Sequence, residues 1–312
     1  MLRLGAMTKA RRVRPGGTYL ITRRTLRRHH LLTPDGKIDR VFLYVLAVYA
    51  RKHHIQVHLP MLMSTHEHLV LSDPEGLLPD FLRDLHRHVA LPVKVIREWE
   101  GAVWDHEPTS VVELLTPQAV IEELAYCMAN PVEAGLVRYS RDWPGVSARP
   151  RDLGRRTWRV ERPDVYFNPK NWPDQVELEL TLPPMLLAEH SPDDIRRLVA
   201  EELGRQEQAA RDRVTSKGWR FRGAERCRKT SPYRRAISFE PLRKRNPAFA
   251  VGRGQRDAYV AAAKALRAFR QAYRAARTLW CQGNRTVRFP FGTWWMRRFH
   301  GAHCADPPGH PA

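Results

Sequence analysis

The hydrophobic and polar positions of the first hundred residues alternate between the spacing of a strand and that of a helix. Residues 16–25 have a β-rich alternating run after two glycines, which predicts a strand. Residues 34–54 start with turn residues and continue as a mostly apolar helix, and residues 55–74 supply two strand-like segments joined by a tight "MST" connection. Apolar residues at helical spacing follow over 76–100, and we expect Pro92 to bend or restart that helix.

Two further strand candidates, 102–106 and 110–115, precede a third helix. Thr116 is its expected N-cap and Pro117 its first helical residue, because both residue types are favoured at those positions. We expect the helix to end at Asn130, since the residue before a proline is pushed out of the helical region. The order strand, helix, strand, strand, helix, strand, helix predicts an α+β fold. We expect a ferredoxin-like sandwich of an antiparallel sheet and helices, with the third strand central.

The composition changes near residue 150, and we divide the chain there into domains of residues 1–150 and 151–312. The second part contains one strand-like run, 175–183, and two long helical segments, 191–218 and 255–284. We therefore expect a basic, mainly helical C-terminal extension.

The formal net charge is +20, and it is uneven, because residues 1–150 carry +4 and residues 151–312 carry +16. Charge of this density attracts a polyanion, most often nucleic acid and sometimes an anionic membrane. A membrane partner is disfavoured because the longest apolar run, "VFLYVLAVYA", has ten residues, too few for a span. The four cysteines form no CxxC pair and fit free thiols in a reducing cytosol. Composition thus indicates a cytoplasmic protein that faces nucleic acid.

Two pairs of histidines, in "HEH" and "HRH", are each separated by one residue. In a strand, residues i and i+2 point to the same face, so His66 and His68 can bind one cation. In a helix they diverge by roughly 200°, so His86 and His88 cannot easily do so, and we expect "HRH" to be a solvated basic helix face. Taken alone, "HEH" fits equally well two surface histidines on an edge strand.

The helix that contains "YCMANP" favours the metal site over two surface histidines. Tyr126 and Asn130 lie on one helix face, with Glu122 one turn earlier. Packed beside the strand, Asn130 can complete a His, His, Asn metal set with Tyr126 one turn away. Mixed nitrogen and oxygen ligands with open positions suit Mg²⁺ or Mn²⁺ bound at a substrate phosphate. The alternative for Tyr126 is a half-buried aromatic in a core helix.

Three segments together resemble a known family, the HUH single-tyrosine transposases, and specifically the REP-associated tyrosine transposases. They are "MSTHEHLVL", "YCMANPVEAGLV" about sixty residues later, and "RDWPGVS" after it. With the N-terminal "TYLITRRTLRRHHLL", the resemblance covers roughly residues 15–150. The paired histidines are weakly specific, whereas the tyrosine motif at this distance from them is much more specific.

The resemblance implies an HUH nuclease domain that cleaves single-stranded DNA near a hairpin, as a transposase acting in DNA recombination. Tyr126 would be the nucleophile that becomes linked to a 5′ phosphate. His66, His68 and Asn130 would bind Mg²⁺ or Mn²⁺, and Glu122 would be an accessory base or metal-adjacent group, unless it is a solvated helix residue. The family also implies a monomer or homodimer in the bacterial cytoplasm, associated with the nucleoid.

The residue between the two histidines departs from the family pattern. It is usually hydrophobic in these transposases, whereas here it is Glu67. A buried, unpaired carboxylate would cost several kcal/mol, so we expect either a basic partner for Glu67 or a partly open face of the sheet. The segment "VWDHEPTSVVELL" also lacks the basic residues expected there. Both differences leave room for a domesticated or weakly active enzyme.

Basic and aromatic residues are interleaved in two stretches of the second part, 217–235 and 285–301. Arginine contacts phosphates and aromatic rings stack on unpaired bases, although the same residues also fit a core with a solvated surface. His303 and Cys304 are expected to lie in a disordered tail. Our candidates for DNA contact are Arg23, Arg24, Arg27, Arg28, Arg220, Arg222, Arg234, Arg235, Trp294, Trp295, Arg297 and Arg298.

Three functions compete on the sequence alone. The first is a metal-dependent endonuclease and strand-transferase, and the second is a non-catalytic or domesticated protein that binds DNA hairpins. The third is an RNA-binding protein with a ferredoxin-like sheet, which is disfavoured because "VHLPML" and "HEHLVL" lack the aromatic pairs that such sheets use for stacking.

Overall fold

The fold begins with strands and helices in the order that the sequence predicts. The computed structural model describes residues 10–237 and 247–307. The first elements are β1 (Gly17–Arg24), α1 (Gly36–Lys52), β2 (Gln56–Met63), β3 (His66–Asp73), α2 (Leu78–Arg97), β4 (Ser110–Leu114) and α3 (Pro117–Glu133). The candidate strand at 102–106 forms only an isolated bridge, in which Trp104 pairs with Thr25.

The main sheet has the strand order β2-β3-β1-β4-β7. The first four strands pair antiparallel, and the two-residue β7 (Phe249–Ala250) adds to β4 in parallel. This strand order, with α1 and α2 as the two crossovers, is that of a ferredoxin-like α+β sandwich. The predicted fold class is confirmed, and β3 lies inside the sheet between β2 and β1.

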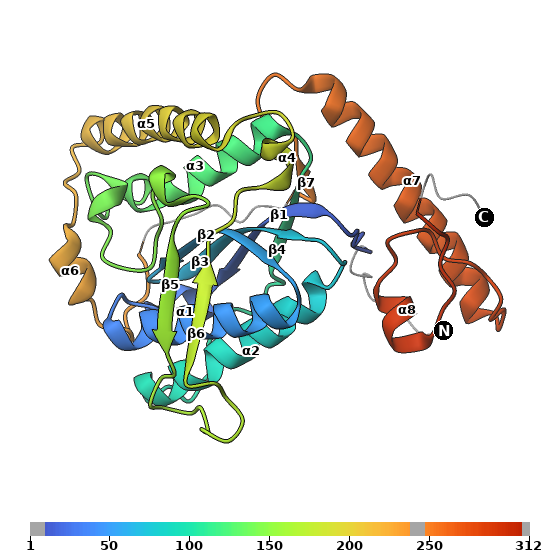
Figure 1. The fold of residues 1–312 in the computed structure, drawn as a ribbon, viewed down its shortest axis with the longest axis horizontal. Coiled ribbons are helices and arrows are strands. Elements are labelled where there is room, and N and C mark those ends of the chain that lie inside the picture. Colours follow the sequence, from blue (N-terminus) through green and yellow to red (C-terminus); the bar gives the residue numbers. More distant parts are fainter. Residues whose placement is uncertain (1–9, 238–246, 308–312) are drawn as a thin grey trace.

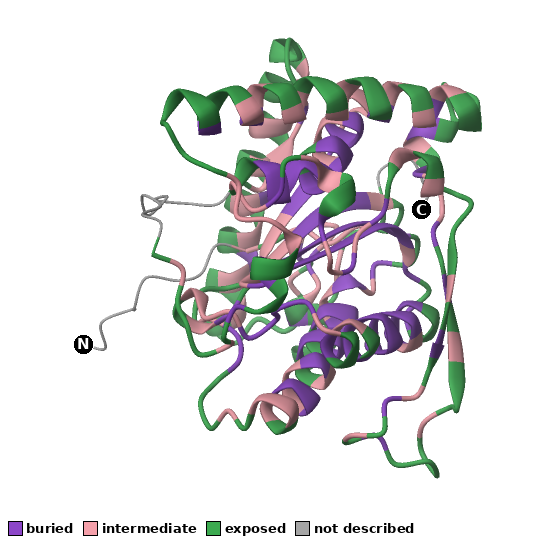
Figure 2. Ribbon diagram, turned by 90° about the vertical axis from the view of Figure 1, so that its left-hand side faces the viewer, coloured by how far each residue is buried: buried purple, intermediate pink, exposed green. Residues whose placement is uncertain are grey.

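Helices cover both faces of the sheet (Figure 1). α1 and α2 pack together on one face, α3 lies on the other, and α5 packs on the outer side of α3. Figure 2 shows the sheet as a largely buried layer under helices with exposed outer surfaces. Because side chains alternate along a strand, His66 and His68 point towards α3 while Glu67 points towards α1 and α2.

Two prolines lie inside helices. The sequence predicts a bend or restart at Pro92 and a helix end before Pro131. α2 continues as one helix through Pro92, and α3 continues through Pro131 to Glu133. The expected end of α3 at Asn130 is therefore wrong. Asn130, Pro131 and Val132 are all buried, and their packing offsets the backbone hydrogen bond that a proline cannot donate. The start of α3 is as predicted, because the hydroxyl of Thr116 accepts a hydrogen bond from the backbone of Ala119.

The hydrophobic core continues across residue 150. Val160, Leu178, Ile195 and Val199 belong to the same buried cluster as the sheet. The remaining elements that follow α3 are β5 (Thr157–Glu161), β6 (Gln175–Glu179), α4 (Pro184–Leu187), α5 (Pro192–Ser216), α6 (Ala224–Arg228), α7 (Arg256–Cys281) and α8 (Trp295–His300). Short 3₁₀ turns follow β1 at Leu26–Arg28 and α3 at Ser140–Asp142 and Pro150–Asp152. The two long helices of the second part are confirmed, and β5 was not foreseen.

α7 and α8 stand beside the sandwich with a small core of their own (Figure 1). Phe289 is fully buried against Ala276, Met296 and Ala302. The expected disordered tail is wrong at His303, whose carbonyl accepts a hydrogen bond of 2.8 Å from the backbone of Phe289. Among the helices of residues 10–237 and 247–307, none is long and apolar enough to cross a membrane.

Candidate metal and nucleophile site

Three polar side chains of β3 and α3 meet on the face of the sheet that α3 covers. His66 Nε2 lies 3.3 Å from Asn130 Oδ1, and Asn130 Nδ2 lies 3.1 Å from His68 Nε2. The two imidazole rings stand nearly perpendicular, with centroids 4.7 Å apart. The strand spacing and the helix motif, read separately from the sequence, thus lead to one cluster.

Two threonine hydroxyls lie within hydrogen-bond distance of the Nδ1 atoms of the two imidazoles. Thr22 Oγ1 of β1 lies 2.8 Å from His68 Nδ1, and Thr65 Oγ1 lies 3.0 Å from His66 Nδ1. Because the amide of Asn130 donates to His68 Nε2, the ring proton of His68 sits on Nδ1 and is donated to Thr22. Sequence reasoning missed Thr22, because only the register that pairs it with His68 brings it to the site.

Burial controls the charge of His68. The side chain is enclosed, and desolvation, followed by repulsion from His66 and Arg24, holds its pKa well below the ordinary value of 6.5. His68 is therefore neutral at physiological pH. A neutral imidazole whose Nδ1–H is held by a hydroxyl is the form that a metal ligand requires, since Nε2 then offers a lone pair.

The geometry of the cluster fits a small divalent cation. Two adjacent ligands of an octahedral ion, each about 2.1 Å from it, are about 3 Å apart, close to the 3.3 Å between His66 Nε2 and Asn130 Oδ1. The ligands would be two imidazoles and one amide oxygen. Within the part of the chain that the structure describes, no group of three His, Cys, Asp or Glu residues gathers into a metal cage. Three protein ligands would leave open coordination positions for substrate oxygens.

Tyr126 lies one turn before Asn130 on α3 and borders this cluster. Its ring centroid is 5.7 Å from that of His68, in an edge-to-face arrangement. The side chain is 39% exposed, although the residues on either side of it in the sequence are buried. This exposure leaves the side chain partly open to an incoming substrate. A half-buried aromatic in a core helix has the same exposure, so the role of Tyr126 stays a prediction.

Glu67 has the basic partner that its burial requires. The side chain is fully buried, and its Oε1 lies 2.6 Å from His86 Nε2 of α2. His86 is itself buried, and its carbonyl accepts a hydrogen bond from Trp104 Nε1. The expectation that "HRH" is a solvated helix face is therefore wrong at His86. The helix turns this residue onto the sheet, where a buried carboxylate faces it.

Glu122, the proposed accessory residue, is bound to the C-terminal part of the chain. Its carboxylate accepts hydrogen bonds from Arg253 Nε at 2.8 Å and from Gln118 Nε2 at 2.7 Å. Burial acts to raise the pKa of Glu122, but these hydrogen bonds outweigh it and lower that pKa. Arg253 also reaches Glu202 of α5. In this arrangement Glu122 anchors the segment between β7 and α7.

Several of the candidate arginines gather near the site. Arg24 pairs across the sheet with His66 and points to the same face. Just beyond it, the backbone of Arg28 pairs with Ala236 and that of His30 with Arg234. Two segments more than 200 residues apart are thereby joined, and their arginines are Arg27, Arg28, Arg234 and Arg235. Arg222 acts electrostatically on His30 in the same region. We name Arg24, Arg27, Arg28, Arg234 and Arg235 the basic strip.

The other candidates for DNA contact lie elsewhere. Arg23 points to the opposite face of the sheet from Arg24 and bonds to the carbonyls of Glu107 and Asp105. Trp294, Trp295, Arg297 and Arg298 belong to the α8 region. That region meets the sheet at the start of β1, where Val13 donates to the carbonyl of Gly292. Arg220 is exposed beyond the end of α5. The structure therefore separates Arg23, at the C-terminal end of β1, from the α8 group near its start and from Arg220 beyond α5.

Comparison with known proteins gives a distant structural likeness. No protein-family model matches the sequence, and no curated protein matches it. A solved REP-associated tyrosine transposase bound to a REP hairpin aligns with a TM-score of 0.40 and 20% identity, over 48% of this chain and 87% of the other. A putative transposase from Deinococcus radiodurans aligns with a TM-score of 0.28 and 18% identity, over 40% of this chain and 94% of the other.

Proposed function

We propose that the chain is a transposase-like, metal-dependent endonuclease and strand-transferase that cuts single-stranded DNA near a hairpin. One observation carries the proposal: His66, His68 and Asn130 converge within hydrogen-bond distance, and the exposed Tyr126 stands one helical turn away. The motifs that resemble REP-associated tyrosine transposases are the same residues, which supports a common chemistry for them.

The cluster has the donor set to hold a divalent cation such as Mg²⁺ or Mn²⁺. When bound, the ion would supply positive charge at the scissile phosphate. Thr22 and Thr65 orient the imidazoles, and the burial of His68 keeps its Nε2 unprotonated. Because Asn130 contributes a neutral oxygen, it would not cancel the positive charge of a bound ion. That charge would attract a phosphate oxygen of the DNA.

Tyr126 would perform the covalent step. Its hydroxyl oxygen attacks phosphorus and loses its proton to solvent, a new bond forms between tyrosine and the 5′ phosphate, and the bond to the 3′ oxygen breaks. The leaving 3′ oxygen takes up a proton as a free hydroxyl. The reverse attack by a 3′ hydroxyl on the phosphotyrosine rejoins DNA without another energy source, which accounts for strand transfer.

The basic strip would guide the strand to this position. Arg24 lies beside His66, and the arginines at 27, 28, 234 and 235 continue from it. Guanidinium groups bind phosphates without regard to sequence, so the strip would orient the backbone and the unpaired bases would carry recognition.

A covalent-adduct assay tests the proposed function. The purified protein is incubated with a hairpin oligonucleotide carrying single-stranded flanks and Mn²⁺ or Mg²⁺, and adducts are resolved on a denaturing gel. We expect an adduct that disappears in Tyr126→Phe and persists in Tyr166→Phe, a matched change at another exposed tyrosine. Binding without an adduct over a range of hairpins and metals would instead establish the non-catalytic hairpin-binding protein.

A further inference from the structure

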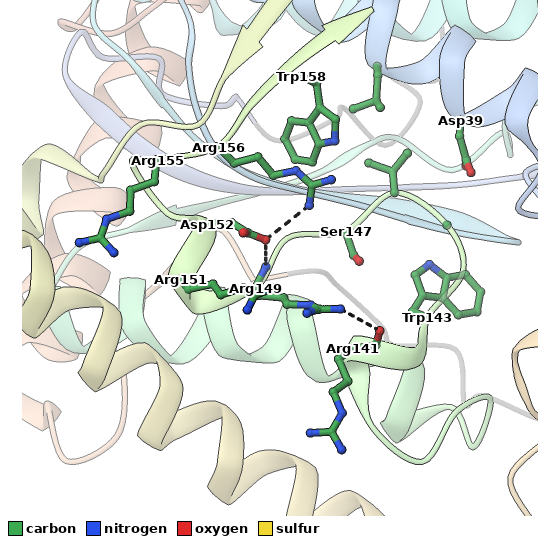
Figure 3. A pocket seen from close by; sticks show the side chains of 13 residues that line it. Asp39, Arg141, Trp143, Ser147, Arg149, Arg151, Asp152, Arg155, Arg156 and Trp158 are labelled. Carbon is green, nitrogen blue, oxygen red and sulfur yellow. Dashed lines mark hydrogen bonds and ion pairs between the residues drawn. The ribbon is translucent and has the colours of Figure 1, made fainter.

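A basic cavity, separate from the basic strip, lies at the β2 edge of the sheet (Figure 3). Its volume is about 700 Å³, and it is bounded by α1, the segment after α3 and the start of β5. Five arginines line it: Arg141, Arg149, Arg151, Arg155 and Arg156. None of them belongs to the metal and nucleophile site or to the basic strip.

The acidic residues of the cavity neutralise only part of this charge. Asp152 and Asp39 are the two carboxylates of the lining. Asp152 binds the guanidinium of Arg156 and caps the backbone of Arg149. Burial, followed by repulsion from Asp35, raises the pKa of Asp39 to about 7, so this group carries only part of a negative charge at neutral pH. The cavity therefore has a clear excess of positive charge.

Two of the arginines are available to a ligand. The side chain of Arg149 makes its hydrogen bond to the carbonyl of Arg141, at 3.5 Å, and not to a carboxylate. Arg151 is exposed and forms no ion pair within residues 10–237 and 247–307. By contrast, Arg155 is paired with Asp193 at 2.8 Å. A phosphate can bind Arg149 and Arg151 without first displacing an acidic side chain.

An aromatic platform lies beside these arginines. The guanidinium of Arg156 sits 4.2 Å from the centre of the Trp158 ring, and Trp158 packs its other parts against the core. Figure 3 shows Arg156 and Trp158 together above Arg149 and Arg151. Planar guanidinium and indole groups beside phosphate-binding arginines are the combination that single-stranded nucleic acid uses, since bases stack while the backbone is neutralised.

The cavity is fixed to the strand next to the candidate metal site. Trp143 Nε1 donates to the carbonyl of Leu62 at 3.0 Å, and the backbone of Leu62 donates to Val146 at 2.9 Å. Leu62 precedes Met63, which pairs with His66 across the sheet. Neighbouring strands are only about 4.8 Å apart, so the cavity lies one strand beyond the strand that contains His66.

We propose that the cavity binds consecutive phosphates of a single-stranded DNA flank, with a base placed against Arg156 and Trp158. That the bound strand is the flank of a cleaved hairpin rests on the proposed function. That the cavity binds phosphates rests only on the residues that line it. Free phosphate or a mononucleotide shares that chemistry, and the experiment separates these sources from a DNA strand.

Salt-dependent binding of a fluorescent single-stranded oligonucleotide tests this proposal. The variant Arg149→Gln/Arg151→Gln is compared with Arg51→Gln/Arg87→Gln, which removes two exposed charges from α1 and α2. Each lost single-strand contact reduces the slope of log K against log salt by about 0.7, so we expect a loss of about 1.4 in slope and about 25-fold in affinity at 0.1 M salt. The control should keep the wild-type slope.

Two further measurements separate the outcomes. An adduct at Tyr126 with an unchanged slope in the cavity variant would overturn the cavity and leave the proposed function intact. A reduced slope without any adduct would support the cavity and contradict the nuclease. If inorganic phosphate at constant ionic strength raises the melting temperature of the wild type only, while oligonucleotide affinity is equal in both, the cavity takes free phosphate and the DNA proposal is wrong.

Discussion

The carboxylate of Glu67 and the imidazole of His86 form a buried contact of 2.6 Å that joins β3 to α2. Glu67 lies between His66 and His68, and its side chain points away from theirs. The contact therefore fixes β3 to α2 on the face of the sheet opposite to the candidate metal site. A polar residue at this position is compatible with the fold because α2 supplies its partner.

The first prediction concerns this pair and stability. His86→Ala leaves a buried carboxylate without its partner and should lower the free energy of unfolding by about 3 kcal/mol. The double variant Glu67→Leu/His86→Leu should recover much of that loss, because it removes both polar groups. Urea denaturation measures both values.

An exposed histidine supplies the control for this prediction. His54 lies 3.5 Å from Glu75, and both side chains are more than half exposed. His54→Ala should change stability little, since exposed pairs contribute at most about 1 kcal/mol. Equal losses of unfolding free energy in His54→Ala and His86→Ala would show that the buried contact stabilises the fold no more than an exposed one.

The second prediction concerns the orientation of His68. Thr22→Val keeps the shape of the side chain but removes the hydroxyl that accepts the Nδ1 proton of His68. We expect the Mn²⁺ concentration for half-maximal adduct formation to rise about tenfold or more, as for other lost partners of metal-ligating histidines. Thr18→Val on the same strand face removes a bond to Ser72 instead and serves as the control. Equal Mn²⁺ dependence in both variants would contradict the role of Thr22.

The third prediction concerns the candidate ligand set, which has no negatively charged member. Asn130→Asp replaces an amide oxygen with a carboxylate beside His66 and His68. We expect the variant to be less stable than the wild type without metal, because it buries a charge, and to bind Mn²⁺ at least about tenfold more tightly. Titration calorimetry and thermal melting with and without Mn²⁺ measure the two effects. Unchanged Mn²⁺ affinity would place the metal elsewhere.

The fourth prediction concerns pH and His58, which is remote from the candidate ligands. Burial lowers the pKa of this histidine to about 4, although a hydrogen bond to the carbonyl of Thr181 opposes the shift. The unfolded chain binds a proton near pH 6.5 that the folded chain refuses, so His58 should cost stability as the pH falls from about 6.5 towards 4. Between pH 7 and pH 5 this loss is about 2 kcal/mol.

The variant His58→Gln tests that assignment. Its free energy of unfolding should fall less between pH 7 and pH 5 than that of the wild type, by about 2 kcal/mol, as measured by urea denaturation at each pH. His68, whose pKa is also lowered by burial, contributes in the same direction in both proteins. An identical pH dependence in the two proteins would show that His58 is not kept neutral by burial.

The sequence was sufficient wherever local periodicity decides the structure. Strand alternation places His66 and His68 on one face, and helical spacing places Tyr126 and Asn130 in one row. These two patterns predict the cluster once the helix packs on the strand. The strand order also follows, because the alternation of strands with two crossover helices leaves few ways to form the sheet.

Sequence reasoning failed where long-range packing overrides a local rule. Pro131 was expected to end α3, but burial of the following turn keeps it helical. His86 was expected in solvent, because its partner Glu67 lies on another element. The sequence could not predict that the two segments of the basic strip adjoin either, since this needs the backbone pairing of residues 28 and 30 with 236 and 234.

Mass spectrometry of the protein–DNA adduct tests the central claim most directly. After incubation with a hairpin oligonucleotide and Mn²⁺, protease and nuclease digestion leaves a nucleotide remnant on the peptide whose side chain attacked the phosphate. We predict a single 5′-phosphate linkage on Tyr126, formed only with metal and only when His66 and His68 are intact. A linkage on another residue, or an unmodified Tyr126 in protein that binds the hairpin, would contradict the account.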